Sequence, residues 1–146
     1  SAGRPMPAKI FDTLLYISPQ VTIEAVTLRE DKPKRVEVLL TRRSRRETRY
    51  PGIWHVPGSF LRQGERTADV LRRIARAELG IGSFAVTEFV TWLNVHDSPK
   101  GHFVSLVYRC AITRVPTHGR WYPISKLPPN VLPYQRQIIS ATLGGS

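Results

Sequence analysis

Alternating hydrophobic and polar positions predict several β-strands along this chain. These segments are rich in β-branched and aromatic residues, which favour an extended backbone. A turn-rich break over residues 30–34 separates the first two, so we expect them to form a hairpin with a wide loop. The polar stretch over residues 94–102 is predicted to be a loop. The predicted strands cover residues 21–28, 35–41, 84–93, 103–112 and, as a short edge strand, 119–123.

A different spacing predicts a helix over residues 65–79. Apolar side chains such as Leu71 and Ile74 recur there at intervals of three and four residues, which places them on one side of an α-helix. Gly80 follows at the position where a helix C-terminus favours a left-handed backbone. A final helix is expected over residues 133–143. Strands before and after a well-patterned helix predict a mixed α/β domain.

The length of the chain predicts a single domain. It has 146 residues, of which 41% are hydrophobic, an ordinary globular composition. We expect residues 1–146 to form one unit. Residues 1–10 contain prolines and no periodicity, so they are predicted to be a loose N-terminal arm.

Charge and cysteine content narrow the classes of partner and compartment. Lys and Arg number 22 against 11 Asp and Glu, a net charge of +11 that favours phosphates or nucleic acid as partners. Cys110 is the only cysteine, which excludes a disulfide framework and a cysteine zinc site. We found neither a signal-peptide pattern nor an apolar run long enough to span a membrane, so a cytoplasmic, reducing location and no membrane partner are expected.

An arginine-rich segment follows the second predicted strand. It is either a solvated loop or an anion-binding lip, because guanidinium groups match the geometry of phosphate oxygens. Its arginines are Arg42, Arg43, Arg45, Arg46 and Arg49.

The segment from Trp54 to Ile81 resembles the signature of the Nudix hydrolase superfamily. That signature reads Gly, five residues, Glu, seven residues, Arg-Glu, an aliphatic residue, any residue, Glu-Glu, any residue, Gly and an aliphatic residue. The resemblance extends to Arg120–Pro128 and covers about residues 20–142. The matching positions are Glu65, Arg73, Glu78, Gly80 and Ile81.

The signature is degenerate at three positions. Ser59 replaces its first glycine, and Ile74 and Ala77 replace two of its glutamates. In the family, the helical carboxylates bind Mg²⁺ or Mn²⁺, and one of them often activates water. Residues 74, 77 and 78 would share one face of an α-helix, so this chain keeps one of three carboxylates there, Glu78. The resemblance also implies an α/β/α sandwich with a mixed β-sheet.

The resemblance assigns candidate roles to individual residues. Glu78 and Glu65 are the remaining acids for metal binding and catalysis, with Arg73 beside them. The general base is open, because Ile74 cannot serve; Glu88, His96 and Asp97 are candidates, although the His-Asp segment is also typical of a polar loop. Candidate substrate contacts are Arg43 and Arg62 for phosphates and Trp54 and Phe60, which either stack on a base or pack the loop.

Three functions follow from these observations. The first is a Nudix-type hydrolase that cleaves the diphosphate linkage of a nucleoside diphosphate derivative, or acts on another phosphorylated small molecule, with a divalent metal and with weak or non-standard activity. The second is a non-catalytic nucleotide-binding sensor or assembly module that has lost the metal site. The third is a nucleic-acid-binding protein that uses its arginines.

Overall fold

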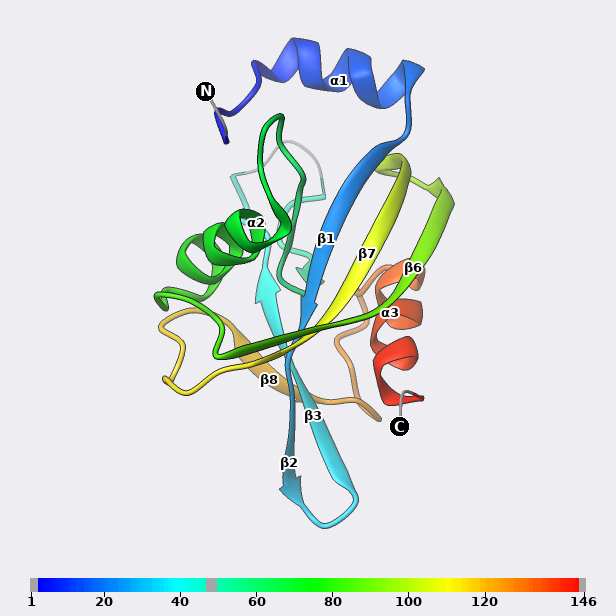
Figure 1. The fold of residues 1–146 in the computed structure, drawn as a ribbon. Coiled ribbons are helices and arrows are strands. Elements are labelled where there is room, and N and C mark those ends of the chain that lie inside the picture. The colour runs from blue at the N-terminus through cyan, green and yellow to red at the C-terminus, as the bar shows by residue number, and fades with distance from the viewer. Residues whose placement is uncertain (1–2, 47–49, 145–146) are drawn as a thin grey trace.

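The computed structural model describes residues 3–46 and 50–144 and shows an α/β fold with helices on both sides of a mixed sheet (Figure 1). Arg49 of the arginine-rich segment lies outside the described residues. The elements in chain order are α1 (Ala8–Ile17), β1 (Gln20–Val26), β2 (Leu28–Lys32), β3 (Arg35–Arg42), β4 (Trp54–His55), β5 (Gly58–Phe60), α2 (Thr67–Ile74), the π-helical turn η1 (Ala75–Leu79), β6 (Val86–Ser98), β7 (Gly101–Ala111), β8 (Arg120–Pro123) and α3 (Pro133–Leu143).

The first sheet has the order β5-β1-β7-β6 and contains both kinds of pairing. β1 runs parallel to β7, with Ile23 opposite Leu106, and antiparallel to β5, with Ile23 opposite Ser59. Helix α2 packs on β1 and β5, whereas α3 packs on β6, β7 and β1. Their buried side chains belong to two separate clusters, represented by Ile74 under α2 and Ile138 under α3. The predicted mixed sheet within an α/β fold is therefore confirmed.

The second sheet is built around β3. β2 and β3 form an antiparallel hairpin, and β8 pairs with the other edge of β3, with Leu39 opposite Trp121. β4 joins the end of β3, where Thr41 faces His55. This arrangement places the ends of β3, β4 and β8 beside the C-terminal end of α2, where a cavity forms.

The predicted hairpin between residues 21–28 and 35–41 is correct only at its end, where Leu28 pairs with Val38, and its wide loop is a tight turn at residues 33–34. β1 ends at Val26, and a separate strand, β2, pairs with β3. Ile23 and Ala25 on one face and Val26 on the other are all fully buried. Such a strand needs cover on both faces and neighbours on both edges, so it lies in the centre of a sheet rather than in a hairpin.

Two other predicted loops are ordered elements. Residues 94–102 are not a loop, because β6 continues to Ser98 and β7 begins at Gly101. β6 is an edge strand, and an edge strand tolerates polar side chains on its exposed face. The predicted loose arm over residues 1–10 is wrong from Ala8 onward, where α1 begins. No helix in the described ranges is long and apolar enough to cross a bilayer.

The predicted helix over residues 65–79 is confirmed, with a change of geometry inside it. The α-helical part ends at Ile74, and residues 75–79 form a wider π-helical turn. Val70, Leu71 and Ile74 supply the buried side of α2. Gly80 ends the segment with a φ of 67°, the left-handed backbone expected there.

Candidate functional site

A cavity of about 430 Å³ opens between the π-helical turn and the ends of β3, β4 and β8. Its wall contains one carboxylate, one guanidinium and one indole ring. Such a wall offers both polar and aromatic contacts to a small molecule. The lining residues are Thr41, Arg42, Trp54, Ala77, Glu78, His118 and Gly119.

The π-helical turn determines which side chains of the helical segment reach this cavity. Ile74 is 1% exposed and packs in the core with Ile23 and Val70. Ala77 and Glu78 lie past the point where the helix widens, and both line the cavity. Of the three positions expected to share one α-helical face, residues 77 and 78 line the cavity, whereas Ile74 packs in the core beside Ile23.

Two carboxylates from distant parts of the chain meet at Gly58. Glu78 Oε2 accepts a hydrogen bond of 2.7 Å from the Gly58 N–H. Glu24, from the middle of β1, approaches so closely that a Cβ built on Gly58 would lie 2.1 Å from Glu24 Oε2. Only glycine fits this position without displacing the carboxylate. His55 Nε2 lies 3.9 Å from the other oxygen of Glu78.

Burial leaves the charges of this pair poorly compensated. It raises the pKa of Glu24 to about 8, and it raises the pKa of Glu78 to about 8 with a further contribution from the charge of Glu24. The Lys100 ammonium acts in the opposite direction on both carboxylates. Burial also lowers the pKa of His55 to about 4, so this imidazole is neutral at neutral pH. The site therefore combines two carboxylates that resist ionisation with a neutral histidine.

Lys100 and α3 complete the buried polar cluster. Lys100 lies in the turn between β6 and β7, and its Nζ donates a hydrogen bond of 3.4 Å to the Tyr134 hydroxyl. Gln135 is 2% exposed, and its Oε1 accepts a hydrogen bond of 2.7 Å from the Val56 N–H. The Gln135 side chain also bonds to Glu24, which favours the charged form of that carboxyl. α3 thus fixes β1 and the segment before Gly58 in one arrangement.

Glu65 and Arg73 form a separate structure, which we name the loop clamp. Arg73 donates from Nε and Nη2 to the two oxygens of Glu65, at 3.0 and 2.8 Å. Arg73 also donates to Ser59 Oγ at 2.6 Å and to the Phe60 carbonyl at 2.9 Å. Glu65 in turn accepts from the Arg62 N–H at 2.8 Å. Both oxygens of Glu65 are thus engaged in holding the loop before α2, rather than facing the Glu78 cavity.

The predicted substrate contacts divide into two groups. Arg62 donates from Nη1 to the Gly3 carbonyl at 2.8 Å, and Phe60 packs edge-on against the rings of Phe11 and Phe103. These two residues therefore stabilise the N-terminal segment and the core. Neither of them lines the cavity.

Trp54 lies at the cavity, and Arg43, which does not line it, acts on the buried cluster behind it. Trp54 lines the cavity, packs edge-on against Tyr122 and has the Arg42 guanidinium 5.7 Å from its ring centre. The Arg43 guanidinium is close enough to the buried cluster to help lower the pKa of His55 and of Lys100. The site thus has cationic side chains on the β3 side.

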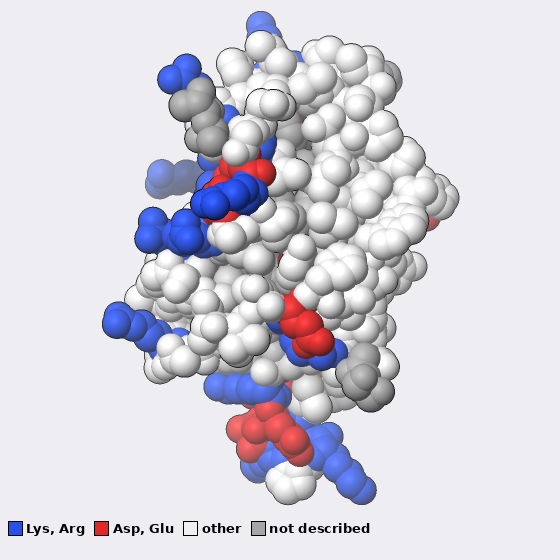
Figure 2. Space-filling view, in the orientation of Figure 1, with Lys and Arg blue, Asp and Glu red and all other residues white. Residues whose placement is uncertain are grey.

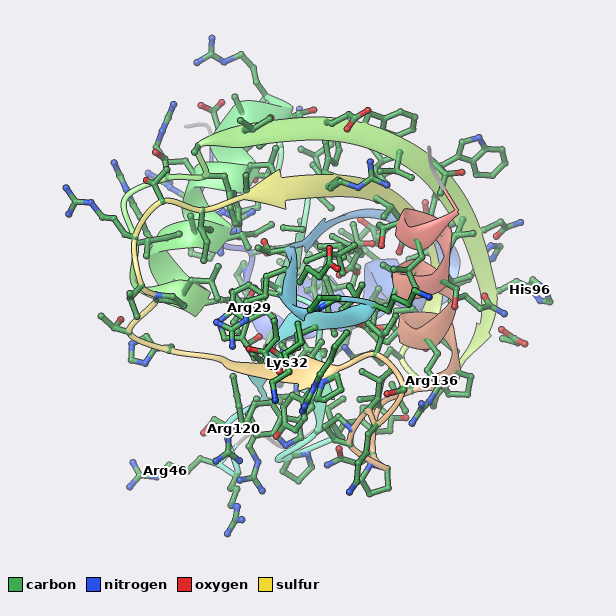
Figure 3. All side chains as sticks on the ribbon, turned by 90° about the horizontal axis from the view of Figure 1, so that it is seen from below. Arg29, Lys32, Arg46, His96, Arg120 and Arg136 are labelled. Carbon is green, nitrogen blue, oxygen red and sulfur yellow. The ribbon has the colours of Figure 1, made fainter. Side chains whose placement is uncertain are left out.

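The candidate general bases lie elsewhere. Glu88 is exposed and pairs with Arg109 at 3.4 Å, beside a second cavity of about 400 Å³. His96 and Asp97 are exposed residues near the end of β6, and Figure 3 shows His96 pointing outward at the rim of the molecule. The structure does not bring these side chains to the Glu78 cavity.

Sequence reasoning missed Glu24 and Lys100. Glu24 had a signal, because it is the one charged residue in the otherwise apolar and hydroxyl-bearing segment 21–28. A lone acid in such a strand is buried at a cost unless it has a partner or a function. Lys100 had no comparable signal, since its turn is polar throughout. Its direction depends on the packing of β7 against α3.

Solved structures of Nudix proteins resemble this fold at low sequence identity. A MutT NUDIX hydrolase from Burkholderia pseudomallei is 20% identical, with a TM-score of 0.70 and coverage of 85% of this chain and 98% of that chain. The NUDIX domain of Shewanella oneidensis NrtR, in complex with ADP ribose, is 18% identical, with a TM-score of 0.66 and coverage of 94% and 97%. NrtR in complex with a 27mer DNA is 19% identical, with a TM-score of 0.62 and coverage of 83% and 59%.

Sequence comparison gives the family directly. No curated protein matches the chain at a significant level. The NUDIX domain family model matches residues 18–141, from two residues before β1 to the last turn of α3. Since this match spans most of the chain, the protein belongs to the NUDIX domain family.

Proposed function

We propose that this protein hydrolyses the diphosphate linkage of a nucleoside diphosphate derivative, with a divalent cation, in the cavity beside Glu78. The observation that carries the proposal is the convergence of Glu24 and Glu78 on Gly58. Two buried carboxylates in contact with the same residue are costly unless a cation or a reaction uses them. The family supports the reaction class, since one structural relative is named a NUDIX hydrolase, and another carries ADP ribose in its NUDIX domain, which supports the ligand class.

The donor set of this site fits a Mg²⁺ or Mn²⁺ ion. Among the described residues, no group of three or more His, Cys, Asp or Glu side chains is arranged to hold a metal. Mg²⁺ nevertheless binds through one or two carboxylates when substrate phosphates supply further oxygens. Glu24 and Glu78 would be the protein ligands. When bound, such an ion neutralises phosphate charge and favours deprotonation of water.

Other side chains of the site would bind and orient the substrate. Arg43 and Lys100 offer positive charge beside the carboxylates, so we assign them to the phosphate oxygens. Trp54 lines the cavity and offers an aromatic surface to a nucleobase, with Arg42 next to it. His55 is neutral and lies near Glu78, where it can accept or share a hydrogen bond with water.

The same contacts explain why we expect weak or non-standard activity. The site has lost the carboxylates that the family places at residues 74 and 77, so a cation has fewer protein ligands. Lys100 also interacts with both remaining carboxylates and competes with a cation for them.

A product assay with matched variants tests the proposal. The protein is incubated with ADP-ribose, nucleotide sugars, dinucleoside polyphosphates and nucleoside triphosphates, with Mg²⁺ or Mn²⁺. We expect metal-dependent release of a nucleoside monophosphate, and a loss of about 100-fold or more in Glu78→Gln and in Glu24→Gln. Glu30→Gln, an exposed glutamate on β2, is the control and should leave turnover unchanged. Equal turnover in all three variants would refute the proposed site.

The position of Lys100 favours a second candidate, a nucleotide-binding module without turnover. The charges of the Lys100 ammonium and the Arg43 guanidinium act on this buried cluster and could bind a diphosphate without a metal. Calorimetry decides between the two. Tight binding of ADP-ribose in the presence of EDTA, with no product in the metal assay, would support the module rather than the hydrolase.

A further inference from the structure

One face of the first sheet is apolar and only partly covered by the chain itself. Phe89 and Trp92 of β6 point to the same side as Tyr108 and Leu106 of β7, because they stand opposite each other in register. The Phe89 and Tyr108 rings pack edge-on with centres 5.5 Å apart. Phe89 is 50% exposed and Trp92 is 59% exposed. We name this surface the β6–β7 face.

The arrangement of the helices explains the exposure. Ile23 of β1 continues the same face and is fully buried, because α2 packs on β1 and β5. α3 packs on the opposite face, where Val95 and Val107 belong to its cluster. α2 therefore covers the β1 side of the sheet, and β7 and β6 extend beyond it (Figure 1).

The β6–β7 face also differs from the rest of the surface in charge. The chain carries a net charge of +11. Figure 2 shows Lys and Arg gathered along the α2 side and around the β2–β3 hairpin, whereas the surface over β7 and β6 is almost free of them. Two copies of such a molecule repel each other in most orientations, and the repulsion is smallest where uncharged faces meet. An acidic partner, by contrast, would bind most strongly at the α2 side, where the Lys and Arg side chains gather.

We propose that the β6–β7 face packs against the same face of a second copy of this chain across a two-fold axis. Such an interface is isologous, so Phe89 and Trp92 of each copy contact the matching apolar residues of the other. Aromatic residues at the centre of an interface contribute a large share of its binding energy. This inference is independent of the proposed function, since the face is separate from the Glu78 cavity.

Sedimentation equilibrium across the micromolar range tests the proposal. We expect a monomer–dimer equilibrium whose Kd falls as salt rises, because salt screens the repulsion between the two basic chains. Trp92→Glu should raise the Kd by about 100-fold or more, since the substitution enters the interface twice. Trp92→Phe should keep most of the affinity.

Val115→Glu is the matched control, because Val115 is 89% exposed and lies in the segment between β7 and β8. It should leave the Kd unchanged. Circular dichroism checks that each variant is folded, and Phe89→Glu replaces Trp92→Glu if that variant is not. A monomer at every concentration and salt level would overturn the proposal. So would a dimer that tolerates a glutamate on this face, or one that weakens as salt rises.

Discussion

Glu65 and Glu78 flank the same helix, yet the fold treats their charges in opposite ways. Glu65 receives two hydrogen bonds from Arg73 and one from the Arg62 N–H, and Arg73 holds its pKa below the ordinary value. Glu78 receives one N–H and lies near Glu24, and burial raises its pKa to about 8. Glu65 has a guanidinium partner that neutralises its charge, so it stabilises the fold. Glu78 is buried without a cationic partner in contact among the described residues, so its carboxylate is available to a cation or substrate.

Removing the partner of the balanced carboxylate should have the largest effect on stability. Arg73→Met leaves Glu65, whose side chain is 4% exposed, without its guanidinium. We expect a loss of about 3 kcal/mol in the free energy of unfolding, the usual cost of breaking a buried ion pair from one side. Glu78→Gln replaces a buried carboxyl that resists ionisation with a neutral amide, whose oxygen can still accept the Gly58 N–H, so stability should stay constant or rise. Urea unfolding measures both variants, and a Glu78→Gln loss as large as that of Arg73→Met would contradict the comparison.

Lowering the pH should remove part of the stabilisation that Glu65 gains from its pairing with Arg73. The folded-state pKa of Glu65 is lowered, so its contribution is complete above its unfolded pKa of about 4.3 and disappears as pH falls through the lower folded value. We therefore expect the stability difference between the natural protein and Glu65→Gln to be constant from pH 7 to about pH 5 and to shrink below about pH 4. Denaturant titrations at stepped pH measure this difference. A difference that grows on acidification would show the opposite sign of coupling.

A substitution of Lys100 tests the other half of the comparison, the carboxylates Glu78 and Glu24. Lys100→Met removes the ammonium that acts on Glu24 and Glu78. We expect the affinity for Mn²⁺, measured by calorimetry or electron paramagnetic resonance without substrate, to rise about tenfold, which corresponds to ~1.4 kcal/mol. The control is Lys126→Met, an exposed lysine after β8. Unchanged or weaker Mn²⁺ binding in Lys100→Met would show that the lysine does not compete for the carboxylate pair.

The smallest effect concerns one hydrogen bond of the loop clamp. Ser59 Oγ accepts from Arg73 Nη1 at 2.6 Å. Ser59→Ala should cost about 1 kcal/mol of unfolding free energy, as expected for a hydrogen bond to a charged group that is only partly shielded from water. Thermal unfolding detects this change. Mn²⁺ affinity should not move, because Ser59 belongs to the clamp and not to the carboxylate pair.

Local patterns in the sequence were sufficient to predict those helices and strands that are buried on one side only. The spacing of Leu71 and Ile74 predicted α2, and Gly80 marked the end of the helical segment. The β2–β3 pairing was missed because β1 is buried on both faces and its pattern merges with that of β2. Residues 94–102 were missed as strand because an edge strand with an exposed face can be as polar as a loop.

The candidate site was less accessible from the sequence, because it joins side chains that are far apart along the chain. The family resemblance pointed to Glu78 and Trp54, which line one cavity. It also pointed to Glu65 and Phe60, which the structure uses in the loop clamp and the core. Glu24 lies in β1 and Lys100 in the turn before β7, and the fold places the Lys100 ammonium where its charge acts on Glu24 and where it contacts Tyr134 of α3. No spacing rule along the chain encodes those contacts.

The π-helical turn at Ala75–Leu79 acts as a one-residue insertion in an otherwise regular coil. The first half of this helical segment places apolar side chains in the core, and its second half places a carboxylate at the cavity. Deletion of Arg76, an exposed residue of that turn, would return the coil to its ordinary pitch. Glu78 would then keep its direction toward Gly58, because the deleted residue is the extra one that the wider turn accommodates, and the upstream core would stay in place.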